Sequence, residues 1–102
     1  MSALPEASAP PQTLELPEAL DLIAAAPLAE SLTKRLGANL TIDASHVQRL
    51  GASCLQVLLS AERTWKANGL ALSLVGASER FAEDLRLLGV DPTIFLSGDL
   101  SQ

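Results

Sequence analysis

The first third of the chain alternates between strand-like and helix-like spacing of apolar residues. Polar and apolar residues alternate over Thr13–Leu16, which predicts a short strand that Pro17 ends or confines to a sheet edge. A second brief extended piece is expected at Leu20–Leu22. Over Ala25–Leu36, leucines recur every four residues and form one helical stripe, which Gly37 ends.

The rest of the chain continues this alternation. The run Leu70–Val75 is almost continuously apolar, which is typical of a central strand buried on both faces. Strands and helices that alternate along a chain favour right-handed crossovers and a largely parallel sheet covered by helices. We therefore predict an α/β fold with four to five mostly parallel strands and about three helices packed on them. The further expected elements are a strand at Asn39–Ala44, a helix at Ala52–Ala67, the strand at Leu70–Val75, a helix from an N-cap at Ser78 to about Leu88, and a strand at Thr93–Ser97.

Length and charge limit what this fold can do. The 102 residues suit one domain. Residues 1–12, MSALPEASAPPQ, are rich in proline, alanine and serine and are expected to form a disordered tail, so residues 13–102 are predicted to be a single domain. The net charge is -5 and the seven Lys and Arg are scattered singly, so no basic stripe is present to bind nucleic acid.

The same composition indicates a cytoplasmic location. Cys54 is the only cysteine, so no intrachain disulfide can form. The amino terminus lacks the basic and apolar regions of a secretory signal, and no apolar run reaches the ~20 residues that span a bilayer. We expect a soluble cytoplasmic protein that does not insert into a membrane.

The junction between the strand at Asn39–Ala44 and the following helix carries residue types found in hydrolases. Gly51 and Ser53 resemble half of the nucleophile elbow G-x-S-x-G, but Leu55 stands where the second glycine is required. Asp43, His46 and Ser53 supply the residue types of a catalytic triad in a chain order that the elbow fold does not use. The sequence therefore predicts no enzyme.

No metal or nucleotide cofactor is expected either. His46 is the only histidine and Cys54 the only cysteine, whereas a closed zinc site needs about four ligands. No glycine-rich loop is present, which excludes a P-loop and a dinucleotide fingerprint. We interpret His46 as a solvated turn residue and Cys54 as a buried small hydrophobic residue.

Several polar side chains near the junction allow two interpretations. Asp43 ends a strand on the same rim as Ser53, and it either bonds to backbone N–H groups of its own turn or serves that rim. Ser53 either caps its helix or accepts a phosphate, which the helix dipole would stabilise by ~0.3 to 1 kcal/mol. Glu79, Glu83 and Asp84 are expected to form a solvated face of the third helix.

Four stretches of the chain carry a family resemblance. LTIDASHV at 40–47 fits a strand pattern hhhDhSgh, where h is apolar, and GASCLQVLL at 51–59 fits a helix start D-S-S-G-L-G-h-L. The first strand of the pattern is matched by LPEALDL at 16–22. Its third helix and closing strand are matched by RFAEDLRLLGVDPTIFL at 80–96. In these stretches the chain resembles the STAS family, the sulfate transporter and anti-sigma factor antagonist domain, and the resemblance covers Thr13 to about Ser97.

The resemblance implies a partner-binding rim at the junction. Ser53 occupies the position of the serine that partner kinases phosphorylate, and Asp43 that of the strand-end aspartate. Gly51, Ala52 and Cys54 replace the acidic residue, the first serine and the glycine of the family pattern, and one branch of the family uses this rim for docking without phosphorylation. The implied rim consists of Asp43, Ser45, His46, Gly51, Ala52, Ser53, Gln56 and Val57.

Two branches of the family are similar to this chain. The short end after Ser97 resembles small bacterial STAS proteins associated with chemotaxis histidine kinases. That branch implies a non-enzymatic regulatory protein that binds a signalling ATPase or protein kinase of the GHKL type, a chemotaxis histidine kinase or an anti-sigma factor kinase, and is switched by phosphorylation of Ser53. The alternative is the cytoplasmic STAS accessory subunit of a lipid-transport ABC ATPase. A homodimer through apolar residues such as Val57 is a further option.

Overall fold

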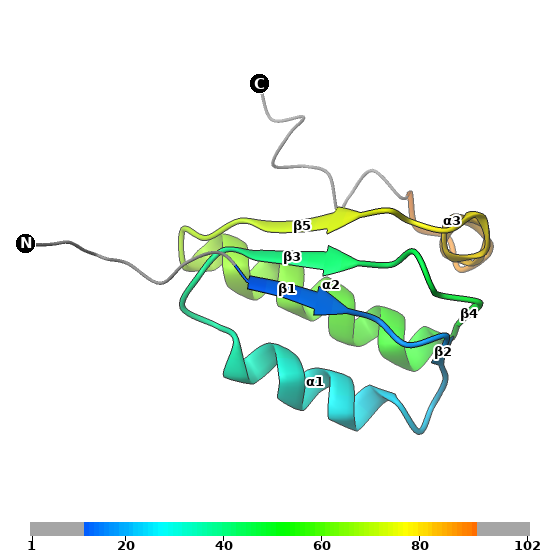
Figure 1. The fold of residues 1–102 in the computed structure, drawn as a ribbon, viewed down its shortest axis with the longest axis horizontal. Coiled ribbons are helices and arrows are strands. Elements are labelled where there is room, and N and C mark those ends of the chain that lie inside the picture. Colours follow the sequence, from blue (N-terminus) through cyan, green and yellow to red (C-terminus); the bar gives the residue numbers. More distant parts are fainter. Residues whose placement is uncertain (1–11, 92–102) are drawn as a thin grey trace, which may run out of the picture.

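Two parallel sheets form the centre of the computed structural model, which describes residues 12–91 (Figure 1). The larger sheet has the strand order β1-β3-β5 and consists of β1 (Gln12–Glu15), β3 (Leu40–Asp43) and β5 (Leu72–Val75). β2 (Ala19–Leu20) pairs with β4 (Arg49–Leu50) in a sheet of its own. Every strand pair within residues 12–91 is parallel, so the carboxyl ends of the strands lie at the same edge of the fold.

Pro17 separates the two sheets. The N–H of Leu16 donates the last hydrogen bond of the first ladder to the carbonyl of Asp43, at 2.9 Å. Pro17 has no N–H with which to continue that ladder. Pairing resumes one residue later, where the carbonyl of Glu18 accepts a 3.1 Å hydrogen bond from the N–H of Arg49. The second brief extended piece expected from the sequence therefore lies slightly earlier than predicted, as β2.

Three helices pack against these strands. α1 (Ala25–Lys34) and α2 (Ala52–Ala67) lie side by side on one face of the larger sheet (Figure 1). α3 (Glu79–Leu87) lies beyond the carboxyl end of that sheet and packs against β4. Ser78 is the N-cap of α3, as the sequence predicts, and its hydroxyl accepts a 3.0 Å hydrogen bond from the N–H of Phe81.

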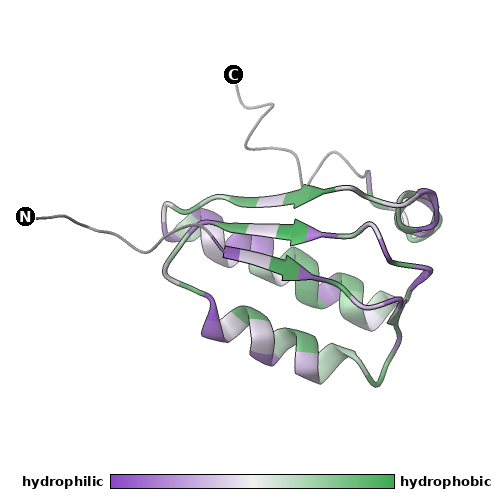
Figure 2. Cartoon of the chain, viewed as in Figure 1, coloured by the Kyte–Doolittle hydropathy of each residue, from purple (hydrophilic) through white to green (hydrophobic). Residues whose placement is uncertain are grey.

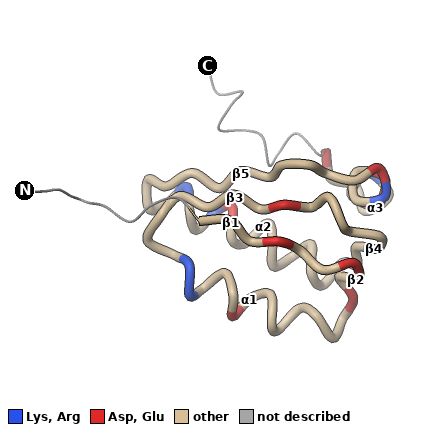
Figure 3. The backbone as a smooth tube through the Cα atoms, in the orientation of Figure 1, with Lys and Arg blue, Asp and Glu red and all other residues tan. Residues whose placement is uncertain are grey.

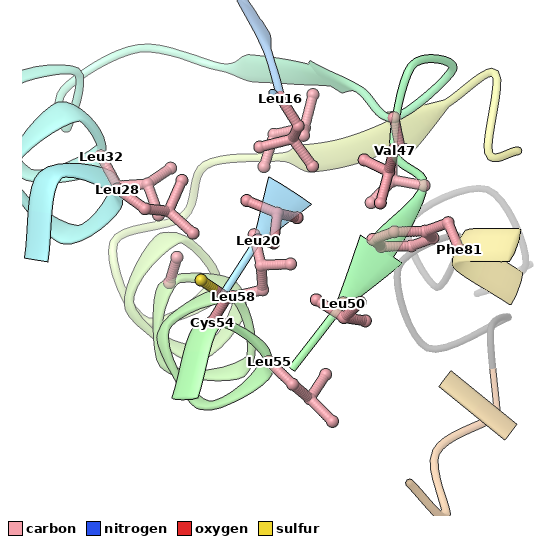
Figure 4. Packing of buried hydrophobic residues seen from close by; sticks show 14 of the residues in the cluster. Leu16, Leu20, Leu28, Leu32, Val47, Leu50, Cys54, Leu55, Leu58 and Phe81 are labelled. Atoms are coloured by element: carbon pink, nitrogen blue, oxygen red, sulfur yellow. The ribbon is translucent and has the colours of Figure 1, made fainter. Parts of the chain in front are cut away.

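One hydrophobic cluster joins the strands to the helices. Ile42 of β3 and Leu58 of α2 are both fully buried in it. At the carboxyl end of the sheet, Phe81 of α3 lies beside Val47 and Leu50, so α3 extends the same cluster (Figure 4). Burial of these side chains supplies most of the free energy that holds the helices on the sheets.

The other face of the larger sheet is polar. Thr13, Thr41 and Ser73 lie opposite one another across the three strands, in the pale segments of Figure 2, and alternate with residues that face the helices. Burial along β5 alternates in the same way, and Val75 is 46% exposed. The prediction of a central strand buried on both faces is therefore wrong. Within residues 12–91, β5 pairs only with β3, and the apolar run arises because Ala71 and Val75 occupy exposed positions.

The α/β fold class, with parallel strands and three helices, is confirmed. The sequence does not predict β4, because Arg49–Leu50 is too short to show a period of two. Gln12, which the sequence assigns to the tail, is the first residue of β1. The strand expected at Thr93–Ser97 and the rest of the tail lie outside the described residues, so the division into a tail and one domain stays a prediction.

Trp65 connects the end of α2 to the segment that enters β3. It is the only tryptophan and is buried, and its indole N–H donates a 2.9 Å hydrogen bond to the carbonyl of Ala38. We expect Trp65→Phe to lower the free energy of unfolding by about 1–3 kcal/mol, because it leaves a buried carbonyl without its donor and shrinks a core side chain. Urea unfolding followed by far-UV circular dichroism measures this loss.

Lys66→Ala, at the neighbouring exposed position, is the matched control for Trp65→Phe. It removes a 3.6 Å ion pair between the 71% exposed Lys66 and the 11% exposed Glu62, and because pairs four residues apart on a helix contribute about 0.3–0.5 kcal/mol, stability should change by no more than about that amount. A loss for Trp65→Phe as small as that of the control would contradict the role given to the indole hydrogen bond.

Candidate functional site

The residues of the predicted rim fall into two groups at the carboxyl edge of the strands. One group occupies the turn after β3, and the other occupies the amino end of α2. Within the described residues, no hydrogen bond or ion pair joins the two groups, and the buried side chains of Val47 and Leu50 lie in the chain between them. The turn group is Asp43, Ser45 and His46, and the helix group is Gly51, Ala52, Ser53, Gln56 and Val57.

Asp43 organises the turn group locally. Its Oδ1 accepts a 2.9 Å hydrogen bond from the N–H of Ser45. That bond, then the Ser45 hydroxyl and, more weakly, the charge of His46 lower the pKa of the Asp43 carboxyl below its usual value. Gly76 lies against this turn and has a φ of +63°. A Cβ at this position would lie 3.3 Å from Asp43 Oδ1. Of the two interpretations of Asp43, the structure therefore supports the bond to its own turn, and His46 is exposed as expected.

The amino end of α2 carries no side-chain cap. Gly51 is the N-cap residue, with extended backbone angles, and its N–H donates a 2.8 Å hydrogen bond to the carbonyl of Leu20. Ser53 lies two residues inside the N-cap and is half-buried, and its hydroxyl forms no hydrogen bond in the part of the chain that the structure describes. The interpretation of Ser53 as a helix cap is wrong, because a capping oxygen must sit at the N-cap position to reach the N–H groups of the first turn.

Gly51 fits closely against β2. A Cβ built on it would lie 3.3 Å from the carbonyl oxygen of Leu20, so the backbone of β2 leaves little room for a side chain there. The first turn of α2 contains no acidic residue. Cys54, one position after Ser53, is buried and its thiol donates to the carbonyl of Asp21 with an Sγ–O distance of 3.2 Å. Burial, then the charge of Asp21, raises the pKa of this thiol. The place of Cys54 in the buried core agrees with its interpretation as a small packing residue.

Two exposed apolar residues next to α2 are missing from the predicted rim. Leu22 is 76% and Ile23 84% exposed. They follow Asp21 in a turn where the N–H of Ala24 donates to the Asp21 side chain at 3.1 Å, and the carbonyl of Asp21 accepts the thiol of Cys54. Leu22 and Ile23 therefore lie beside the first turn of α2. The sequence gives only a weak signal of their exposure, because two adjacent apolar residues are too short a run to stand out from the helical spacing of the apolar residues.

We define the α2 rim as the helix group together with this exposed pair. Its apolar residues surround first-turn N–H groups that have no acceptor within the described part of the chain. The N-cap of α3, by contrast, is occupied by a serine hydroxyl. The α2 rim consists of Leu22, Ile23, Gly51, Ala52, Ser53, Gln56 and Val57.

Asp84 has a different role from the one expected. Its Oδ2 accepts a 2.9 Å hydrogen bond from the N–H of Leu50, directly before Gly51, and Asp84 is half-buried. The prediction that Asp84 belongs to a solvated face is therefore wrong, whereas Glu79 and Glu83 are exposed as predicted. The correction has a physical cause: the partner N–H lies 34 residues away in the chain and cannot be found from helical periodicity.

Asp43, His46 and Ser53, which supply the residue types of a catalytic triad, are not arranged as a triad in the structure. Among the described residues, the hydroxyl of Ser53 forms no hydrogen bond to His46 or to any other group. Within residues 12–91, no group of three or more His, Cys, Asp and Glu side chains is placed to hold a metal ion. None of the helices in the same region is long and apolar enough to cross a bilayer.

A family model described as "Mlab, STAS domain" matches residues 5–100 of the chain. The chain belongs to the STAS family. A crystal structure of a sulfate transporter family protein from Wolinella succinogenes has a similar fold, with a TM-score of 0.69 and 17% sequence identity over 85% of this chain and 73% of that chain. No curated protein sequence matches this chain. STAS domains are in general non-catalytic regulatory domains, which is compatible with an open rim that has no assembled triad.

The two serines at helix starts offer a direct test of this geometry. Ser78→Ala should lower the free energy of unfolding by about 0.5–2 kcal/mol, because it removes a cap and a 2.6 Å hydrogen bond to the carbonyl of Val47. Ser53→Ala should change it by less than about 0.5 kcal/mol, because its hydroxyl has no partner. Urea unfolding of both variants measures the difference, and an equal loss in both would show that Ser53 caps α2 after all.

Proposed function

We propose that this STAS domain is a non-enzymatic regulatory protein of the cytoplasm that binds an ATPase-type partner protein through the α2 rim. The observation that carries the proposal is the exposure of Leu22 and Ile23 beside an uncapped helix end. Two adjacent apolar side chains of this size gain free energy when a partner covers them. The neighbouring N–H groups of Ala52 and Ser53 have no acceptor within residues 12–91, so they remain able to bind a carbonyl or carboxylate of that partner.

In the first form of the proposal, the partner is a signalling kinase of the GHKL type and Ser53 is its phosphorylation site. The hydroxyl of Ser53 supports this form, because it is half-buried, lies in the first turn of α2 and has no hydrogen bond to break. A phosphate there would add nearly two negative charges close to the positive end of the helix dipole. The phosphate charges would also lie beside Leu22 and Ile23. An apolar contact at these two side chains would then be weakened, because it would have to remove charged groups from water.

In the alternative form, the partner is the ATPase of a lipid-transport ABC transporter and Ser53 is never modified. The close contact between Gly51 and Leu20 supports this form. It leaves little room for the acidic residue that the phosphorylated branch carries at that position, and the first turn of α2 has no other acid. The rim would then serve as a permanent docking surface.

Both forms predict the same effect of charge at the rim. The probe is the ATPase or kinase that co-purifies with the tagged chain from its native cells, purified on its own and titrated calorimetrically. Ile23→Asp and Ser53→Asp should each weaken its binding by at least about tenfold, because each places a charge in an apolar contact. Leu87→Asp is the matched control, since Leu87 is 81% exposed but lies on α3, and it should change affinity by less than about twofold.

Unchanged affinity in both rim variants would refute the α2 rim as the interface. An equally large loss of affinity in Leu87→Asp would also refute the α2 rim as the interface. The added charge would then weaken binding wherever on the surface it is placed. Phosphopeptide mass spectrometry on the native protein separates the two forms. Phosphate on Ser53 supports the kinase form, and unmodified Ser53 in a complex with the transporter ATPase supports the alternative.

A further inference from the structure

A groove runs along the surface between α1 and α2. Its volume is about 460 Å³, and it has an apolar floor to which Leu32 of α1 and Ala61 and Trp65 of α2 contribute. Leu36, just after α1, lies at one end of the groove and is 41% exposed. The floor side chains are themselves buried, so the accessible large apolar side chains of the groove are Leu36 and the half-buried Val57, which are suited to contact an apolar segment of another molecule.

The groove continues from the α2 rim. On α2, Ser53, Val57, Ser60 and Thr64 recur at steps of three or four residues and therefore lie along one face of the helix. The last three line the groove, and Gln56 and Val57 belong to both the groove and the rim. A partner that covers the first turn of α2 can therefore continue into the groove without a gap.

The charge of the groove differs from that of the rest of the molecule. Among residues 12–91, Arg63 is the only charged residue that lines it, and its guanidinium forms no ion pair or hydrogen bond within that region. The chain as a whole carries a net charge of -5, and acidic residues such as Glu15 and Asp43 gather at the carboxyl edge of the sheet (Figure 3). The wall of the groove is therefore complementary to a carboxylate on an otherwise apolar occupant.

We propose that this groove binds an apolar segment of the partner protein, in helical form, that carries an acidic side chain opposite Arg63. The inference rests on the proposed function, because the same partner would cover the α2 rim. From Val57 to Trp65, α2 offers about 12 Å along the groove, which is the length of about two helical turns. A segment of that length with apolar residues three and four apart fits the floor of the groove, and covers Leu36 at its end.

Charge reversal at Arg63 tests the electrostatic part of the inference. With the co-purified ATPase or kinase as the probe, Arg63→Glu should weaken binding by at least about fivefold, because it replaces an attraction by a repulsion. Arg63→Lys should keep binding within about twofold of the original chain, because it keeps the charge. Arg86→Glu makes the same charge change on exposed α3 and should also stay within about twofold.

Blocking the groove tests its steric part. Ser60 is exposed and lines the groove, so Ser60→Trp should fill it and weaken binding by at least about tenfold while the thermal midpoint stays close to that of the original chain. Glu83→Trp adds the same side chain to an exposed position of α3 and should leave the affinity unchanged.

The outcomes separate this inference from the proposed function. Loss of binding in Ile23→Asp, with no loss in Arg63→Glu and Ser60→Trp, would overturn the groove inference and leave the rim intact. No loss in any of the three would overturn both. A photo-crosslinker at Ser60 identifies the occupant: a crosslinked partner peptide with apolar residues and Asp or Glu supports the inference, and a basic peptide or a lipid overturns it.

Discussion

The backbone hydrogen bond from the N–H of Gly51 to the carbonyl of Leu20 fixes the point at which α2 begins. At 2.8 Å it extends the short β2–β4 ladder by one residue, directly before the first helical turn. The thiol of Cys54 then bonds to the carbonyl of Asp21, so the two attachments hold the helix start to consecutive residues of the chain. Leu22 follows at once, and its exposure is a direct result of where these bonds leave the backbone.

A second contact holds the same point from the other side. The carboxylate of Asp84 accepts the N–H of Leu50, so α3 is tied to the residue that precedes Gly51. A hydrogen bond to a charged acceptor contributes about 1.5–3 kcal/mol when it is shielded from water. The amino end of α2 is thus held between β2 and α3, and its own first-turn N–H groups remain open. The rim is already formed in the chain alone, and such preorganisation would lower the entropic cost of binding the proposed partner.

Periodic features of the fold can be predicted from the sequence, and contacts between distant residues cannot. α1 can be predicted because its leucines recur every four residues, and the bond from the N–H of Ser45 to the Asp43 carboxylate can be foreseen because it spans only two residues. The cap assigned to Ser53 is wrong because a sequence locates a helix start only to within a few residues. The exposure of Leu22 and Ile23 cannot be predicted from the sequence, because residue type alone does not distinguish an apolar residue in the core from one that faces solvent.

The central claim is that a partner binds along α2, from its uncapped start into the groove beside α1. Hydrogen–deuterium exchange of the chain with and without its co-purified ATPase or kinase is the decisive measurement, because it maps the whole surface at once. The account predicts slower exchange over residues 22–25 and 52–64, with no change over residues 79–88 of α3. Slower exchange confined to α3, or to the strands whose polar face carries Thr41 and Ser73, would contradict it.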